Sequence, residues 1–174
     1  MSTQNDTLSC FAQITLDSIL EEIGGDVFSL LIDEASDVSD KEQMAVVLRY
    51  VDKLELILER LVGVVHVSET SATCLKSALE RLLAKIGLSF KQVRGQCYDG
   101  ASNMRGEFNG LKAKILEENR SAYYVHCFAH QLQLVIVAIS KKNEDIADFF
   151  YMISLLFNVV GASCKRKDMI RESN

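Results

Sequence analysis

The order of the apolar segments constrains the fold of this chain more than any other feature. Three short apolar runs, at 26–33, 42–52 and 55–67, precede the first capped amphipathic helix, at 68–87. Strands joined by short turns pair antiparallel, whereas strands separated by a helix pair parallel. Strand-like and helix-like segments alternate after the helix. The sequence therefore predicts an α/β fold with a mixed five-stranded sheet in the order β-β-β-α-β-α-β-α, with flanking helices.

Hydroxyl residues and glycines set the predicted ends of these elements. Ser68 or Thr70 is the predicted N-cap of the first capped helix, and Gly87 ends it. Gly24 and Gly25 stop an earlier helix at the N-terminus. The remaining strands are predicted at 90–99 and 122–128, and the remaining helices at 8–24, 109–119, 129–142 and 144–161.

Composition places the chain among ordinary globular domains. Hydrophobic residues make up 48% and charged residues 25% of the 174 positions, enough for one domain with a core. The apolar run at 132–139 is too short to span a bilayer, and the N-terminus lacks the pattern of a secretory signal. We therefore expect no membrane partner and a nuclear or cytosolic location. Five single cysteines are expected to be reduced thiols: Cys10, Cys74, Cys97, Cys127 and Cys164.

Charge is unevenly distributed along the chain. Residues 1–60 contain 13 acids and 4 bases, whereas residues 61–174 contain 11 acids and 15 bases. A dedicated nucleic-acid-binding module is usually basic overall, and this chain has a net charge of −5. An acidic centre within modestly basic surroundings suits a site that holds divalent cations near phosphates. The alternative is a solvated acidic helix near the N-terminus.

Two aspartates are the main candidates for chemistry. Asp33 closes the first predicted strand and Asp99 closes the fourth, within the stretch "CYDGASNMRG". The helix between these strands allows them to lie parallel and adjacent, which brings their carboxyl ends together. Two neighbouring carboxylates repel each other unless a cation lies between them, and Mg²⁺ typically takes one or two carboxylates plus phosphate oxygens. The alternative is a solvated loop whose acids cap turns and helices.

A second group of candidate ligands lies in "HCFAH" at 126–130. Cys127 and His130 have the i, i+3 spacing of half a zinc site, but the other half is missing. A Cys-His nucleophilic pair lacks an orienting third group. No G-x-x-x-x-G-K-[ST] loop is present, which argues against that kind of nucleotide hydrolysis.

Three ordered stretches carry a family resemblance: "FSLLIDEASDVSDKEQMAVVLRYVD", "RGQCYDGASNMRGEFNGLKAKI" and "YYVHCFAHQLQLVIVA". Together they resemble the catalytic domain of hAT-type transposases, closest to plant transposase-derived proteins labelled MYM-type zinc-finger-like. The resemblance implies an RNase H-like fold. It also implies three segments: an N-terminal helical lead-in at 1–25, the core at 26–140, and the start of a helical insertion at 141–174.

The resemblance also assigns functional residues. In that family an Asp, Asp, Glu triad uses Mg²⁺ or Mn²⁺ to cleave and join DNA, and oligomers form in full-length members. Asp33 matches the first acid and Asp99 the second, while Cys127 and His130 match a Cys-x-x-His motif beside the catalytic centre. No residue matches the third acid. We therefore expect this chain alone to be inactive.

Two alternative functions remain open at this stage. The fold could be retained as a non-catalytic module that binds protein or nucleic acid, in which case the two acids would bind no Mg²⁺. It could also be a nucleotide-binding α/β domain of unrelated ancestry, which nucleotides would stabilise against heat.

Overall fold

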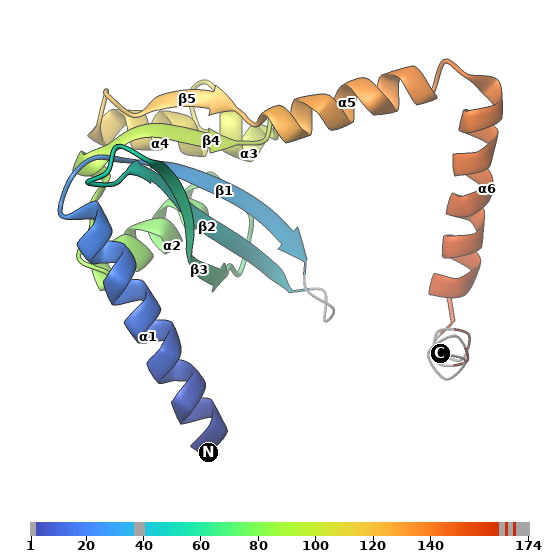
Figure 1. Cartoon of the computed structure of the whole chain (residues 1–174). Coiled ribbons are helices and arrows are strands. Elements are labelled where there is room, and N and C mark those ends of the chain that lie inside the picture. The colour runs from blue at the N-terminus through green and yellow to red at the C-terminus, as the bar shows by residue number, and fades with distance from the viewer. Residues whose placement is uncertain (1–2, 37–40, 164–165, 167–168, 170–174) are drawn as a thin grey trace. The chain divides into compact units, whose positions relative to one another are not determined.

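The computed structural model describes residues 3–36, 41–163, 166 and 169. It divides into two compact units, Met1–Cys127 and Phe128–Asn174, which we describe separately. In the first unit a five-stranded sheet has the strand order β3-β2-β1-β4-β5 (Figure 1). The elements of this unit are α1 (Thr3–Ile23), β1 (Phe28–Ser36), β2 (Glu42–Val51), β3 (Ile57–His66), α2 (Ala72–Lys85), a 3₁₀ turn η1 (Phe90–Gln92), β4 (Val93–Tyr98), α3 (Ser102–Arg105), α4 (Leu111–Glu118) and β5 (Tyr123–His126).

The sheet is antiparallel on one side of β1 and parallel on the other. β1 pairs antiparallel with β2, and β2 pairs antiparallel with β3. β1 pairs parallel with β4, and β4 pairs parallel with β5. The long connection through α2 makes the parallel pairing of β1 and β4 possible, as the sequence predicted. The predicted α/β class and the mixed five-stranded sheet are confirmed.

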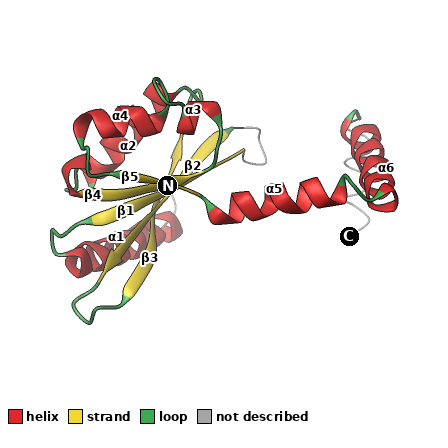
Figure 2. Ribbon diagram, turned by 90° about the horizontal axis from the view of Figure 1, so that it is seen from above, coloured by secondary structure: helices red, strands yellow, loops and turns green. Residues whose placement is uncertain are grey.

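The two faces of the sheet differ in how they are packed. We call the covered face the one on which α1, α2 and α4 pack, and the open face the other one. Figure 2 shows α2, α3 and α4 together on one side of the strands. Strand residues on the covered face are buried, with exposed fractions of 5% or less: Phe28, Leu30, Ile32, Met44, Val46, Leu48, Tyr50, Val93, Gln96 and Tyr98.

Large apolar side chains on the open face remain exposed. Leu61 is 57% exposed and Val64 56%, and both lie on β3. Tyr123 and Val125 of β5 are exposed on the same face, at 72% and 46%. Alternating residues of a strand point to opposite faces, so each strand of this sheet contributes to both environments.

Several predicted boundaries are wrong in detail. The N-cap of α2 is Ser71, whose hydroxyl accepts a hydrogen bond from the backbone N–H of Cys74 at 3.3 Å. Neither Ser68 nor Thr70 takes this role, because three hydroxyl residues within four positions compete for one cap. β1 also continues past Asp33 to Ser36, since β2 pairs with it throughout that stretch. The short helix α3 was not predicted.

The second unit contains two helices, α5 (Phe128–Ser140) and α6 (Glu144–Gly161). The side chain of Asn143 caps α6 by accepting a hydrogen bond from the N–H of Ile146 at 3.1 Å. Both helices lie close to their predicted ranges. Among the described residues, no helix is long and apolar enough to cross a bilayer. The predicted division into segments 1–25, 26–140 and 141–174 stays a prediction, and Cys164 lies outside the described residues.

Candidate site at the carboxyl edge of the sheet

The structure brings Asp33 and Asp99 to neighbouring positions on adjacent strands. The parallel ladder of β1 and β4 pairs Leu31 with Cys97, and each aspartate comes two residues later in the chain, Asp33 within β1 and Asp99 directly after β4. Because side chains alternate along a strand, Asp33 shares the open face with Leu31, while Asp99 lies in the turn that follows β4. Asp33 also pairs with Ala45 on the other side of β1, so the sheet fixes its backbone from both flanks.

Hydrogen bonds hold Asp99 in a defined turn directly after β4. Its Oδ1 accepts the backbone N–H of Ala101 at 3.1 Å. Its backbone carbonyl accepts the hydroxyl of Tyr124 at 2.9 Å, and the same hydroxyl lies 3.2 Å from the carbonyl oxygen of Tyr98. The turn-capping alternative for Asp99 is thus observed. Capping engages one carboxylate oxygen and is compatible with a second role for the side chain.

A third carboxylate, Glu34, lies next to Asp33 in the chain but points to the covered face. Its Oε2 accepts a hydrogen bond from the side-chain amide of Asn103 at 3.4 Å, and that amide also donates to the carbonyl of Thr70 at 2.8 Å. Its Oε1 is buried without a hydrogen-bond partner. Burial raises the pKa of Glu34 above its ordinary value of 4.5, and the charges of Asp99 and Asp33 raise it further, against a lowering by Asn103.

Neither Glu34 nor Asn103 stands out in the sequence as a candidate site residue. Both residues occur within the quoted stretches, but neither has a spacing signal of its own. They meet because α3 carries Asn103 to the end of β1. A polar residue in the turn after Asp99 was the only signal in the sequence that pointed to such a contact.

Cys127, the residue directly after β5, lies beside Asp99, the residue directly after β4. Its backbone N–H donates to the carbonyl of Tyr98 at 3.0 Å, which continues the parallel ladder of β4 and β5 by one residue. Burial raises the pKa of the Cys97 thiol, and the neighbouring Cys127 raises it further. Asp33 on β1, Asp99 just after β4 and Cys127 just after β5 therefore occupy neighbouring positions at one edge of the sheet.

His130, the other residue of the predicted Cys-x-x-His pair, belongs to the first turn of α5 in the second unit. Among the described residues, no group of three or more His, Cys, Asp or Glu side chains is arranged to hold a metal ion. Structural zinc needs four such ligands. Mg²⁺, by contrast, is commonly held by one or two carboxylates together with water and phosphate oxygens, so the Asp33–Asp99 pair fits Mg²⁺ or Mn²⁺.

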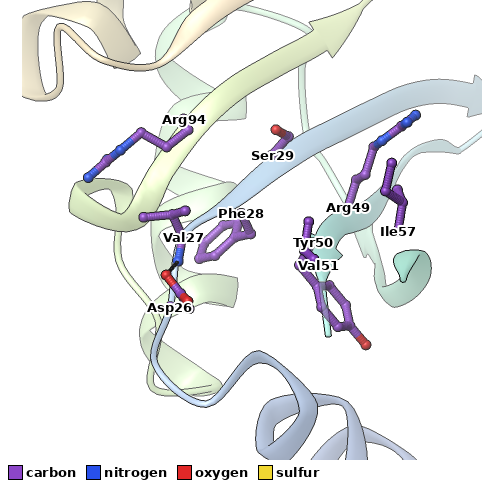
Figure 3. A pocket seen from close by; sticks show the side chains of 9 residues that line it. All are labelled: Asp26, Val27, Phe28, Ser29, Arg49, Tyr50, Val51, Ile57 and Arg94. Atoms are coloured by element: carbon purple, nitrogen blue, oxygen red, sulfur yellow. Dashed lines mark hydrogen bonds between the residues drawn. The ribbon is translucent and has the colours of Figure 1, made fainter. Parts of the chain in front are cut away.

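A separate cavity of about 240 Å³ lies at the opposite end of β1 (Figure 3). Arg49 and Arg94 line it, but their guanidinium groups point away from each other in the figure. Arg49 pairs with Glu59 at 2.9 Å, and Arg94 donates to the carbonyls of Lys91 and Val93. These partners occupy both arginines. This cavity is therefore a weaker candidate for a functional site than the edge of the sheet that carries Asp33.

Comparison with known protein families matches residues 1–110 to the family described as "ZMYM1/FAM200, RNase-like domain". The match covers well over half of the chain and includes both aspartates. This chain belongs to the ZMYM1/FAM200 RNase-like domain family. The family's RNase-like fold agrees with the mixed sheet. The family match also supports the transposase-derived character that the sequence suggested.

Two curated relatives match more distantly. Both are named "52 kDa repressor of the inhibitor of the protein kinase". The human protein is 25% identical over 154 residues and the mouse protein 22% identical over 152 residues. Each alignment covers 82% of this chain and 20% of the relative. The chain thus spans about a fifth of the length of these relatives.

Proposed function

We propose that this RNase-like domain retains a divalent-cation site at Asp33 and Asp99, inherited from an hAT-type transposase that cut and joined DNA. The observation that carries the proposal is the adjacency of the two aspartates at the carboxyl edge of parallel strands β1 and β4. Active sites of α/β sheets favour this edge. The three sequence stretches described above support the hAT ancestry and the affinity with plant MYM-type zinc-finger-like proteins.

The chain's own residues have defined tasks in this proposal. Asp33 and Asp99 hold Mg²⁺ or Mn²⁺, which in phosphoryl transfer stabilises charge on the attacking and leaving oxygens. Tyr124 fixes the backbone at Asp99 through its hydrogen bond to the carbonyl. Asn103 holds Glu34 on the covered face, where its carboxylate adds negative potential behind the pair.

The proposal includes inactivity of the 174-residue chain by itself. Its described residues contain no third acid arranged with Asp33 and Asp99 around a metal. A complete transposase triad has three. DNA as the partner, nuclear location and oligomers in longer relatives are part of the same proposal, supported by the family resemblance.

A titration with Mn²⁺ followed by calorimetry tests the cation site. The wild-type chain should bind Mn²⁺, and Asp33→Asn and Asp99→Asn should each weaken binding by at least about tenfold, because each removes one direct ligand. Asp26→Asn, which changes an aspartate at the other end of β1, serves as the matched control and should bind like the wild type. Equal binding by all four proteins would contradict the proposal.

A supercoiled-plasmid assay tests the predicted inactivity. We expect no Mn²⁺-dependent nicking by the purified chain. Nicking that requires Mn²⁺ and disappears in Asp33→Ala would show that two acids suffice, and would overturn this part of the proposal.

A second candidate function is a non-catalytic interaction module. The open face of the sheet favours it, since Leu61 and Val64 of β3 and Val125 of β5 expose apolar side chains on this face, and exposed apolar surface often marks an interaction site. The names of the curated relatives, which describe repressors, point in the same direction. In this case Mn²⁺ should not bind, which separates the two candidates in the calorimetric titration.

A further inference from the structure

A second polar cavity lies next to Asp99 in the chain, since Gly100 and Ser102 of the segment after β4 line it. It has a volume of about 400 Å³. Two basic side chains, Arg105 from α3 and Lys112 from α4, line it together with one acid, Glu107. The remaining lining residues are small and expose backbone: Gly100, Ser102 and Gly106.

The basic groups of this cavity carry charge that no acid neutralises through an ion pair. Among the described residues, Arg49, Arg60 and Lys76 form ion pairs, whereas neither Arg105 nor Lys112 takes part in one. Arg105 is exposed and Lys112 is partly buried. Arginine and lysine have only donor groups, so their natural ligand is an anion with several acceptor oxygens.

Lys112 is connected to Asp99 through one aromatic ring. Its ammonium lies 5.4 Å from the centre of the Tyr124 ring, within the range of a cation–π interaction. The hydroxyl of the same ring donates to the carbonyl of Asp99. Lys112 therefore contacts the same aromatic ring that fixes the backbone at Asp99.

The loop between the two basic residues is tightly closed. The N–H of Gly110 donates to the carbonyl of Gly106 at 3.1 Å. A Cβ added to Gly110 would lie 2.3 Å from the backbone nitrogen of Gly106, closer than real contacts allow. The two glycines therefore fix the path from α3 to α4, and with it the placement of Arg105 and Lys112 on one cavity.

We propose that Arg105 and Lys112 bind a backbone phosphate of a nucleic-acid strand in this cavity. The proposal rests on the proposed function, since the phosphate would lie on the same strand that approaches Asp33 and Asp99. Arg105 supplies a planar fork suited to two phosphate oxygens, and Lys112 supplies a point charge opposite it. Glu107 reduces the affinity, because its carboxylate repels the phosphate.

The test measures binding of a fluorescein-labelled single-stranded oligonucleotide by fluorescence anisotropy in EDTA, over a range of NaCl concentrations. Arg105→Gln and Lys112→Gln should each weaken binding and reduce the magnitude of the slope of log K against log salt by about 0.7, the value expected for one lost contact to single-stranded phosphate. Lys112→Arg keeps the positive charge and should bind the oligonucleotide as the wild type does. Glu107→Gln should strengthen binding, an effect that misfolding does not produce.

Two control variants share residue types with the test variants, and Lys114 also lies on the same helix as Lys112. Lys114→Gln changes another lysine of α4, and Arg94→Gln changes an arginine at the amino end of β4; neither residue lines this cavity. Both should bind with the wild-type salt slope. Unchanged slopes for Arg105→Gln and Lys112→Gln, or no gain for Glu107→Gln, would overturn the proposal.

Competition distinguishes a strand from a free nucleotide. An unlabelled oligonucleotide should displace the probe at much lower phosphate concentration than ATP does, since only a strand presents successive phosphates. Equal displacement by ATP would overturn the assignment to a strand. EDTA removes divalent cations, so oligonucleotide binding in this assay does not depend on the cation site. If the protein binds the oligonucleotide as expected but does not bind Mn²⁺ in the calorimetric titration, the cation site is contradicted and the phosphate site is not.

Discussion

The two faces of the sheet are built from the same strands but have opposite surroundings. On the covered face, Leu48 of β2 is 0% exposed, whereas on the open face Leu61 of β3 is 57% exposed. The acids at the carboxyl edge divide in the same way. Asp33 is exposed on the open face, and Glu34, one residue later, lies partly buried on the covered face.

This difference shows how one strand gives neighbouring carboxylates separate roles. A hydrated cation needs oxygen ligands that water also reaches, and Asp33 is exposed to water on the open face. Desolvation on the covered face instead raises the pKa of Glu34. Alternation along β1 therefore separates the proposed ligand Asp33 from the partly buried carboxylate of Glu34, although the two residues are consecutive.

The largest expected effect comes from a matched pair of leucine truncations. Leu48→Ala should lower the free energy of unfolding by about 2–5 kcal/mol, because it leaves a cavity in a packed core. Leu61→Ala removes the same atoms from an exposed position and should cost less than about 1 kcal/mol. Urea denaturation of both variants measures the difference. Equal losses would show that the open face is buried in solution.

The buried amide of Gln96 gives the next largest effect. It is 1% exposed, donates to the carbonyl of Ala122 at 2.8 Å and accepts the hydroxyl of Tyr98 at 2.5 Å. Gln96→Ala leaves both partners unsatisfied and should cost at least about 1–3 kcal/mol. Tyr98→Phe removes only the hydrogen bond from the Tyr98 hydroxyl to Gln96 and is the control. If thermal unfolding shows that Tyr98→Phe lowers the stability more than Gln96→Ala does, this account of the hydrogen bonds around Gln96 is wrong.

Glu34→Gln tests the electrostatic contrast between the faces. Because the pKa of Glu34 is raised in the folded protein, the native state holds this proton more tightly than the unfolded chain does. Stability should therefore fall as the pH rises from 4.5 through the raised pKa, and the loss should persist at neutral pH. Glu34→Gln should remove this fall and melt at a higher temperature than the wild type at pH 7. An unchanged pH profile would contradict the prediction.

The smallest effect on stability is expected on the open face itself. Val64→Thr exchanges a methyl group for a hydroxyl at a position that is 56% exposed. Its free energy of unfolding should stay within about 0.5 kcal/mol of the wild-type value. Self-association, measured by light scattering against concentration, should decrease because the apolar surface is smaller. A marked loss of stability would mean that Val64 is packed in solution.

Strand order and the pairing of the two acids follow from the sequence because they depend on connection lengths. The helix between residues 33 and 99 dictated a parallel crossover, and parallel neighbours bring Asp33 and Asp99 together. The prediction erred on the end of β1, since pairing with β2 extends that strand to Ser36.

Other parts of the site depend on contacts between segments distant in the chain. Asn103 meets Glu34, and Tyr124 meets Asp99, through side-chain geometry that no periodicity encodes. The Ser71 cap was missed because Ser68 and Thr70 offer the same chemistry nearby. Such choices among equivalent residues are decided by the local backbone.

Paramagnetic broadening by Mn²⁺ in an ¹⁵N-labelled sample tests the central claim most directly, because it locates the bound ion. If Asp33 and Asp99 hold it, the amide signals of Asp33, Asp99 and Cys127 should broaden first and together, while those around Asp26 at the other end of β1 stay sharp. In Asp33→Asn this selective broadening should disappear. Broadening that begins elsewhere, or that spreads evenly over exposed acids, would contradict a cation site at the carboxyl edge of the sheet.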